Sequence, residues 1–433
     1  MQEIKIVIGG NFGDEGKGLM TDYFTAEAVK AGRKTLVVLS NGGAQRGHTV
    51  TTPSGMRHVF HHFGSGTLAG ADTRLPRFFI VNPMIFMNEV EELITKGVRF
   101  AVPRMPGRGS TGNEIHGHHG EYEKKEGIRI LMDPECPVST PFDMITNQII
   151  EESRGKGRHG SCGVGIWETL LRDGLPLGEM ADMPDPGLYE YLDGECRGQM
   201  KCRLKAFGIR DIPERWRDIV YSGDLLLNYI RDFRDMCSIA VFCGEEIMKE
   251  YDRVIFEAGQ GLLLDRLRKE FGCHTTPSNT GLRNTAELIR EYTDSLHGPE
   301  VMDVEVCYVT RTYLTRHGAG PFKEECGKDE INPDMKDLTN VPNPHQGTLR
   351  YGKPDVAAFL RRIREDYDSE RFPTEWNTRM TLAVTHENEY MPKNLMGSKA
   401  DYHSDGETRI SVRKRTGDRT TGKKSLMEYR VNE

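Results

Sequence analysis

The stretch from Ile4 to Gly18 constrains the fold more than any other, because a short apolar run breaks there into glycines that carry two carboxylates and a lysine. The apolar run predicts a buried strand, and the glycine segment predicts a turn into a helix that begins near Lys17. Backbone N–H groups of such a turn can close around an oxyanion, while the helix N-terminus and Lys17 supply positive charge. The stretch therefore predicts an α/β fold with a P-loop-like loop that can hold a phosphate.

This loop is not a Walker A loop, because Asn11 and Gly18 stand where that pattern needs a glycine and a serine or threonine. No hydroxyl is therefore offered to Mg²⁺. Asp14 is the more informative residue, since a carboxylate beside bound phosphate is repulsive unless a metal ion or a proton joins them. We interpret Asp14 as a magnesium ligand, a general base or both. The alternative is a glycine turn with a solvated acid.

Length and composition indicate a single large α/β domain over residues 1–433, with a central, mostly parallel twisted sheet and helical insertions. The chain has 433 residues, of which 37% are hydrophobic. A net charge of −7 argues against a nucleic-acid partner. No apolar run approaches the roughly 20 residues of a membrane span, and no signal peptide is visible, so we expect a cytoplasmic protein with no membrane partner. The nine cysteines fit reduced thiols better than a disulfide framework.

Hydrophobic periodicity predicts an opening βαβ unit, with a helix over 19–31 and a strand over 35–39, whose ligands lie at the carboxyl ends of the strands. Further strands are expected at 78–80, 128–132, 254–256, 304–310 and 380–385. Further helices are expected at 84–96, 142–153 and 355–364, with a charged helical insertion at about 185–235. A Gly/His-rich loop is expected at 103–127. Its histidines could bind Zn²⁺, but a solvated loop is favoured because no cysteine or paired carboxylate completes a tetrahedral site.

Five further segments agree, in order along the chain, with one enzyme family. They are Asn41–Val50, His61–Gly66, Phe256–Asp265, Thr276–Thr280 and Thr315–Phe322. Together with the Gly-Asp-Glu-Gly-Lys-Gly loop, they make the chain resemble adenylosuccinate synthetases from residue 4 to about residue 360. The resemblance implies a ligase of purine nucleotide biosynthesis.

The resemblance implies a reaction in two steps. The family phosphorylates O6 of a 6-oxopurine nucleotide monophosphate with a nucleoside triphosphate, then displaces the phosphate with the amine of L-aspartate. On this interpretation Asp14 removes the N1 proton, and Mg²⁺ is held by Asp14 and a backbone carbonyl near Gly47. Lys17, the loop amides and His48 stabilise the transferring phosphoryl group, and Gln260 reaches the O6 region. The alternative for His48 is a structural histidine with satisfied hydrogen bonds.

The resemblance also implies which residues surround each substrate. Catalytic residues are expected at Asp14, His48, Lys17 and Gln260. The triphosphate is expected at Gly13, Glu15, Gly16, Lys17, Gly18, Gly47, His48, Thr49, Thr385, Asn388, Thr416 and Gly417. The purine monophosphate is expected at Asp14, Gln45, Ser161, Cys162, Arg172, Gln260 and Thr276. The amino acid is expected at His345 and Arg350, and the metal at Asp14 and Gly47.

Arg172 matches an arginine that in the family reaches across a dimer interface to the monophosphate, which implies a homodimer. The alternative is an ordinary cation at a helix end, a position that the helix dipole also favours.

The amino-acid site departs from the family pattern. The family's aspartate-binding loop carries a cluster of arginines, of which only Arg350 remains within Pro344–Asp355. A second glycine-rich turn, Arg158–Ile166, resembles the family segment that holds the monophosphate, and Val164 replaces an arginine there. A dicarboxylate is best held by paired cations. Either Arg350, Lys353 and His345 rebuild the site, or the nucleophile is another amino acid with fewer negative charges.

The nucleotide sites depart as well. The family reads the guanine of GTP with Thr-Lys-x-Asp, but this chain has Thr385–Asn388, and an Asn side chain suits an adenine edge at least as well. Unless Glu387 substitutes, GTP preference should weaken in favour of ATP. Gln45 stands where the family usually has Asn, and with Cys162 it indicates an altered acceptor such as a guanylate or a deoxynucleotide. Phage-type relatives use a deoxyguanylate.

Two alternatives to a ligase remain. One is a purine-nucleotide-binding regulatory protein that kept the fold and lost activity. The presence together of Asp14, Lys17, His48 and Gln260 favours the enzyme, because a mere binder needs no base at the purine. The other is a GTPase switch, which the missing Walker A serine weakens. The C-terminal Arg415–Thr420 resembles a segment that lines the triphosphate's base, and the alternative there is a flexible tail.

Overall fold

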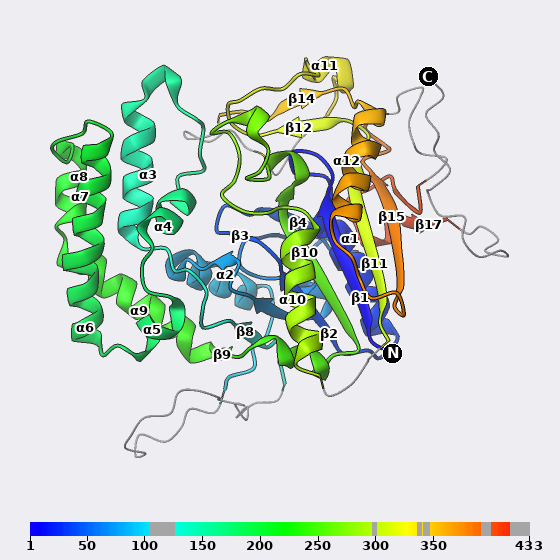
Figure 1. The fold of residues 1–433 in the computed structure, drawn as a ribbon, viewed down its shortest axis with the longest axis horizontal. Coiled ribbons are helices and arrows are strands. Elements are labelled where there is room, and N and C mark those ends of the chain that lie inside the picture. Colours follow the sequence, from blue (N-terminus) through cyan, green and yellow to red (C-terminus); the bar gives the residue numbers. More distant parts are fainter. Residues whose placement is uncertain (104–125, 297–300, 336–339, 341–346, 391–399, 416–433) are drawn as a thin grey trace.

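A ten-stranded sheet forms the centre of the molecule (Figure 1). The computed structural model describes residues 1–103, 126–296, 301–335, 340, 347–390 and 400–415. The strands lie in the order β17, β16, β15, β11, β1, β10, β2, β6, β8, β9. Neighbouring strands are parallel except β16 and β17, so the prediction of a mostly parallel sheet is confirmed.

The strands near the middle of the sheet are those that the apolar runs predict. The sheet consists of β1 (Glu3–Gly9), β2 (Thr35–Leu39), β6 (Asp72–Leu75), β8 (Ile130–Met132), β9 (Ala240–Phe242), β10 (Arg253–Gly261), β11 (Asp303–Arg311), β15 (Asn377–Thr385), β16 (Tyr402–Ser404) and β17 (Val412–Lys414). Short sheets pair β3 (Gly42–Gly43) with β7 (Phe79–Ile80), β4 (His48–Thr51) with β5 (Arg57–Phe60), and β14 (Arg350–Gly352) with β12 (Leu314–Arg316) and β13 (Glu325–Cys326).

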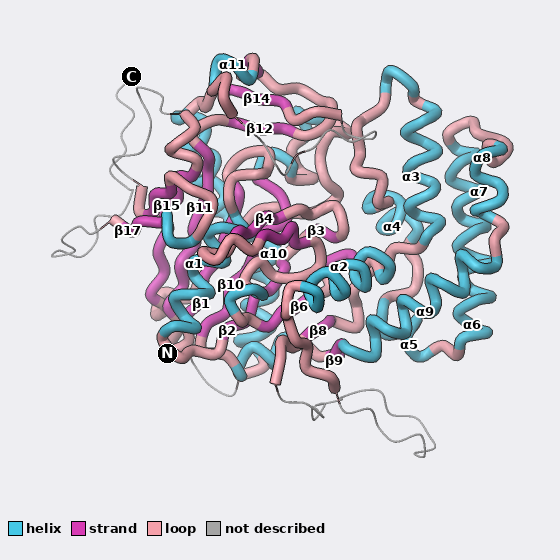
Figure 2. Tube along the Cα trace, turned by 180° about the vertical axis from the view of Figure 1, so that it is seen from behind, coloured by secondary structure: helices cyan, strands magenta, loops and turns pink. Residues whose placement is uncertain are grey.

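Helices cover both faces of the sheet because its central strands are apolar on both faces. Val7 of β1 packs in one cluster with α1 (Lys17–Lys30) and α2 (Pro83–Thr95). Ile6 and Ile8 point the other way, into a second cluster with α10 (Leu282–Asp294) and α12 (Val356–Ser369). Figure 1 shows α10 and α12 in front of the sheet, and Figure 2, from behind, shows α2. The loops at the strand ends are thereby left to form the site.

The strand predicted at 78–80 is present as β7, but it lies outside the main sheet. Phe79 and Ile80 form β7, which pairs with Gly42 and Gly43 in a separate sheet, while β6 takes the position beside β2. The sequence hides β6 because Asp72 and Arg74 are polar. Both are buried and paired, Asp72 with Arg129 and Arg74 with Glu245. Buried ion pairs of this kind break the apolar pattern on which strand prediction rests.

A group of helices lies beside the β8 and β9 end of the sheet (Figure 1). It comprises α3 (Pro141–Ser153), α4 (Ile166–Arg172), α5 (Leu177–Asp182), α6 (Asp185–Glu190), α7 (Arg197–Ala206), α8 (Glu214–Val220) and α9 (Gly223–Ile239). The helical character expected for 185–235 is thus present. Most of the predicted Gly/His-rich loop, residues 104–125, lies outside the described residues. Among the described helices, none has the length and apolar character of a membrane span.

Candidate active site

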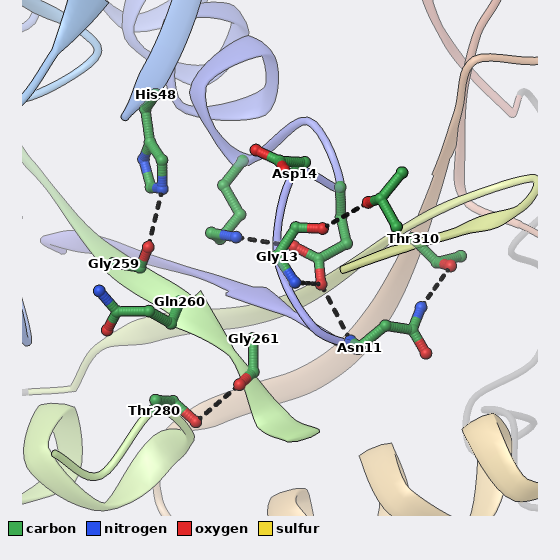
Figure 3. Close-up of polar contacts among 12 residues, drawn as sticks. Asn11, Gly13, Asp14, His48, Gly259, Gln260, Gly261, Thr280 and Thr310 are labelled. Atoms are coloured by element: carbon green, nitrogen blue, oxygen red, sulfur yellow. Dashed lines mark hydrogen bonds and ion pairs between the residues drawn. The ribbon is translucent and has the colours of Figure 1, made fainter. Parts of the chain in front are cut away.

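A cavity of about 400 Å³ lies where the phosphate loop, the 47–51 segment, the end of β11 and the turn after β15 meet. Most of the residues predicted for the triphosphate line it: Glu15, Gly16, Lys17, Gly18, Gly47, His48, Thr49 and Asn388. Asp14, the predicted base and metal ligand, lines it too. Asp14 and His48 therefore face one cavity although they come from different elements. Figure 3 shows the loop, His48 and Gln260 around this part of the molecule.

The phosphate loop is closed by its own carboxylate. Glu15 Oε1 accepts hydrogen bonds from the backbone N–H groups of Asn11, at 3.0 Å, and Gly13, at 2.8 Å. Its Oε2 lies 2.7 Å from Lys17 Nζ, and both side chains are about 2% exposed or less. Amides expected to bind phosphate, and the lysine expected to be catalytic, thus already have an anionic partner.

The N-terminus of α1 is the part of the loop that remains for a phosphate. Gly16 precedes the helix with a φ of 91°, and a side chain there would also meet Thr385. Gly18 lies so close to Thr49 that a Cβ would come within 2.9 Å of its carbonyl oxygen. Thr385 does not line the cavity but donates to Glu15 O at 2.8 Å, behind the loop. These glycines let the backbone approach a ligand at the positive end of the helix.

Asp14 has a left-handed backbone with a φ of 59°, which is rare outside glycine. His317 Nε2 lies 2.8 Å from its Oδ2, and Arg311 Nε donates to its carbonyl oxygen. Burial raises the pKa of the Asp14 carboxyl, but the hydrogen bond from His317 and the charges of His317, Arg311 and Lys17 outweigh it, so the pKa lies well below its usual range. Asp14 is therefore ionised, which a metal ligand requires and a general base permits.

His48 is held by the buried carboxylate of Glu257. Glu257 lies in the Phe256–Asp265 motif, but the sequence patterns predict no role for it. The Nδ1 of His48 lies 2.6 Å from Glu257 Oε1, and its Nε2 lies 3.1 Å from Gly259 O. Arg46 Nη2 is 2.5 Å from Glu257 Oε2. Burial and the charge of Arg46 lower the pKa of His48 to about 4, against the opposing effect of Glu257. The signal that could have found Glu257 is an acid inside the apolar strand β10, where an unpaired charge would be costly.

The predicted purine-binding amides have unused hydrogen-bonding atoms. Asn41 Nδ2 donates to Gln260 Oε1 at 2.7 Å, and Asn41 Oδ1 accepts from Gly259 N at 2.8 Å, so the Gln260 amide is fixed in orientation. Within the described part of the chain, Gln260 Nε2 and both polar atoms of Gln45 are buried without a partner. Buried polar atoms without partners are costly unless a ligand or water satisfies them, as a purine base could.

Ser161, Cys162 and Thr276, three of the predicted monophosphate residues, lie in two turns that meet where the ring centroids of His159 and His274 are 5.1 Å apart. Ser161 and Cys162 follow Gly160, whose neighbour His159 accepts from Ala319 N at 3.2 Å. Ser161 Oγ donates to Asn147 Oδ1 at 2.8 Å. Thr276 is tied by its backbone N–H to Leu264 O at 2.8 Å. The structure thus describes these residues with partners inside the chain.

Arg172 makes its contacts within its own chain, and its predicted reach across a dimer interface stays a prediction. Its guanidinium lies 3.0 Å from Asp143 Oδ1 and donates to Tyr191 OH at 2.8 Å and to Val138 O at 2.7 Å. Its side chain is 5% exposed. Within the single chain, these three partners brace the helix that carries Arg172.

The cations predicted for the amino acid are each paired with an acid. Arg350 forms a two-point contact with Glu325, at 2.7 and 2.5 Å, and Lys353 Nζ lies 2.6 Å from Glu330 Oε2. His345 lies outside the described residues. In the described part of the chain, the charges of Arg350 and Lys353 are therefore each balanced by a neighbouring acid.

The turn after β15 settles where Glu387 points. Its Oε1 lies 2.8 Å from His403 Nδ1, and it does not line the cavity, so it does not substitute at the base-reading position. Asn388 and Glu389 line the cavity instead. Thr416 and Gly417 lie outside the described residues.

The donor set fits a magnesium ion that arrives with a nucleotide. Mg²⁺ is usually held by one or two carboxylates together with substrate phosphates. Asp14 supplies one ionised carboxylate, and Gly47 lines the same cavity. No cluster of three His, Cys, Asp or Glu side chains suited to a metal occurs among the residues that the structure describes, so an all-protein metal cage is not formed there.

Comparison with known proteins gives consistent matches. The family model for adenylosuccinate synthetase matches residues 6–105 and 112–344. The adenylosuccinate synthetase of Chromohalobacter salexigens is 28% identical over 325 residues, which are 74% of this chain and 64% of that protein. That of Alkaliphilus metalliredigens is 27% identical over 372 residues, which are 84% of this chain and 73% of that protein.

Two solved structures share the fold. The fully ligated adenylosuccinate synthetase of Plasmodium falciparum has a TM-score of 0.63 and 15% identity, over 96% of this chain and all of that one. The cyanophage S-2L succinoaminodeoxyadenylate synthetase, bound to dGMP and to dATP as an energy donor, has a TM-score of 0.55 and 13% identity, over 96% of each chain.

Proposed function

The chain belongs to the adenylosuccinate synthetase family, and we propose that it is a ligase that joins an amine to C6 of a purine nucleotide monophosphate, driven by a nucleoside triphosphate. The observation that carries the proposal is that Asp14 and His48 line one cavity with the N-terminus of α1. A base, a hydrogen-bond donor and a phosphate-binding helix end are the groups that phosphoryl transfer to a purine oxygen requires.

In the first step Asp14 takes the N1 proton of the purine, so that O6 attacks the γ-phosphorus. The bond between O6 and phosphorus forms while the bond from phosphorus to the β-phosphate oxygen breaks. His48 and Lys17 stabilise the charge that develops on the transferred group. Mg²⁺, when held by Asp14 and the Gly47 carbonyl, supplies further neutralisation of that charge.

In the second step the free amine attacks C6, the carbon–nitrogen bond forms and the bond between C6 and O6 breaks, so that phosphate leaves with O6 and takes up the proton that the amine nitrogen loses. The role of Gln260 and Gln45 is to orient the base, since Gln260 Nε2 and both polar atoms of the Gln45 amide are buried without partners among the described residues. A guanylate or a deoxynucleotide is a reasonable acceptor beside Gln45, and the S-2L protein, which shares the fold, was solved with dGMP.

We propose an amino acid as the amine donor, either L-aspartate or one with fewer negative charges. The pairs that Arg350 and Lys353 form with Glu325 and Glu330 support the second possibility, because a dicarboxylate would have to compete with both acids. We also propose ATP as a substrate at least as good as GTP, since Glu387 is occupied by His403. A GTP preference above about tenfold, or roughly 1.4 kcal/mol, would contradict the ATP proposal.

A cytoplasmic homodimer is the proposed state of the enzyme. The reach of Arg172 across the interface is part of this proposal, and Trp167 and Leu171 of the same helix, α4, are 41% and 53% exposed. Light scattering at several protein concentrations tests this part of the proposal, and a monomer at every concentration would contradict it.

The ligase is tested by incubating the protein with Mg²⁺, ATP or GTP, a panel of purine monophosphates and a panel of amino acids. Mass spectrometry of the products should show a 6-amino-substituted nucleotide that contains the added amino acid. Release of phosphate alone, whatever amine is supplied, would overturn the ligase proposal. Binding of nucleotides with no turnover would favour the regulatory alternative.

A further inference from the structure

Three side chains of one segment contact Asp14 and the residue before it. Two of them bond to main-chain carbonyl oxygens, and the third lies beside the Asp14 carboxylate. Thr315 Oγ1 donates to Gly13 O at 3.1 Å, and Arg311 Nε donates to Asp14 O. His317 Nε2 lies 2.8 Å from Asp14 Oδ2. We refer to residues 311–317, which run from the last residue of β11 through β12 to the residue after it, as the bracing segment. It contacts the phosphate loop at two successive residues.

The first two contacts fix the backbone. A left-handed conformation at a residue other than glycine costs of order 1 kcal/mol or more and persists where surrounding contacts determine it. Asp14 has such a conformation, and the carbonyl oxygens on both of its sides accept bonds from Arg311 and Thr315. With the main chain held, the direction of the carboxylate depends on its own side-chain rotation.

The third contact restricts that rotation. A carboxylate has two oxygen atoms, and a donor on one of them determines where the other points. His317 occupies the side of Oδ2, and the two side chains are 35% and 18% exposed, so neither is enclosed tightly enough for packing alone to hold the pair. The other oxygen of the Asp14 carboxylate, Oδ1, is thereby left to contact the purine of the acceptor nucleotide.

We propose that His317 is a positioning residue, which holds the Asp14 carboxylate in the orientation from which Oδ1 takes the N1 proton of the acceptor purine. The inference rests on the proposed function for the identity of that proton. His317 itself contacts neither substrate in this arrangement. Misplacing a reacting group by about 1 Å can cost on the order of 100-fold in rate, so a tether on the base has a large effect on turnover.

The test compares His317→Val with His317→Gln, because the Gln amide nitrogen can stand close to where imidazole Nε2 donates. We expect kcat to fall about 30-fold in His317→Val, with KM for each nucleotide within about twofold of wild type. His317→Gln should recover kcat to within about threefold. Unchanged kcat in His317→Val, or equal losses in both variants, would overturn the inference.

His403→Val is the matched control. His403 also pairs with a carboxylate, at 2.8 Å from Glu387 Oε1, and neither residue lines the cavity. We expect its kcat to stay within about twofold of wild type. A loss as large as that of His317→Val would show that removing any imidazole–carboxylate pair slows the protein, and would overturn the specific role.

A second measurement separates this inference from the ligase proposal. Crystal structures of the wild-type protein and of His317→Val, grown under one condition, should show one Asp14 rotamer in the wild type and a changed or divided one in the variant. An unchanged rotamer would overturn the positioning role whatever the enzyme catalyses. A wild-type protein without ligase activity would instead refute the proposed function and leave the rotamer comparison standing.

Discussion

The proposed site has two ends, a phosphoryl end at the phosphate loop and a donor end at the residues expected to bind the amine donor. The charged side chains of these two ends are arranged differently. At the phosphoryl end, Lys17, His48 and Glu257 are less than one-tenth exposed and each is fixed by a partner. At the donor end, Arg350 and Lys353 pair with acids on an open surface, where the four side chains are 24% to 53% exposed. Ion pairs in water contribute little, whereas buried ones are costly to break. The phosphoryl end is therefore constrained, and the donor end is free to exchange partners.

This difference separates the residues that carry out phosphoryl transfer from those that select the second substrate. Groups that act on the transferring phosphoryl must be preorganised, because reorganisation during the reaction raises the barrier. Groups that only bind a second substrate can be altered at small cost to the fold. The comparison predicts large effects on kcat at one end and modest effects on KM at the other.

The largest effect is expected at Asp14. Asp14→Ala should lower kcat by at least about 100-fold, because the purine loses its base and the metal its carboxylate. Turnover is measured at saturating substrates, with the melting temperature as a check on folding. Near-normal turnover in a folded variant would contradict the assignment and remove the basis for contrasting the two ends.

His48→Ala should also lower kcat by at least about 100-fold, since it removes a donor from the developing phosphoryl charge. Glu257→Gln offers an intermediate case, because it keeps the imidazole and removes the carboxylate that orients it. A loss of about tenfold is expected there. If His48→Ala left kcat intact, the structural alternative for this histidine would hold.

Glu325→Gln tests the contrast at the donor end of the proposed site. The change removes the acid that neutralises Arg350 and leaves the guanidinium available to a substrate carboxylate. We expect KM for L-aspartate to fall about fivefold, roughly 1 kcal/mol, with kcat little changed. Steady-state kinetics with aspartate varied test this, and Glu330→Gln provides the parallel change at Lys353. A rise in KM would show that Glu325 organises the site rather than blocking it.

The smallest effect is expected at the base-reading turn. Asn388→Asp should raise the preference for GTP over ATP by about threefold, because a carboxylate accepts from both N–H groups of a guanine edge. The ratio of kcat/KM for the two nucleotides is the measurement. Glu387→Gln is the control, since Glu387 is bound to His403 outside the cavity. An equal shift in both variants would mean that charge near the turn, and not contact with the base, sets the preference.

The sequence predicted the parts of the fold where one pattern dominates. The apolar runs place β1 and β2 correctly, and the helix expected to begin near Lys17 begins at that residue. The sequence failed at β6, whose Asp72 and Arg74 find partners far along the chain, because such pairing cannot be seen in local periodicity.

The sequence predicts which residues belong to the candidate site better than it predicts which partners those residues contact. The shared cavity of Asp14 and His48 agrees with the expected constellation, although the role of each residue stays a prediction. The partners of Arg172 and Arg350 were invisible, because Asp143 and Glu325 lie 29 and 25 positions away in sequence and join them only in the fold. Long-range charge pairing is the information that local patterns lack.

The carboxylate of Glu15 competes with any anion that would bind the loop amides of Asn11 and Gly13 or the Lys17 ammonium. Because it is covalently attached, its local concentration far exceeds that of any free ion, so a lone phosphate or sulfate gains little by replacing it. A ligand that contacts several further parts of the cavity at once can still enter. The vacant enzyme should thus bind nucleotides, which make such further contacts, more tightly than the inorganic phosphate that its reaction releases.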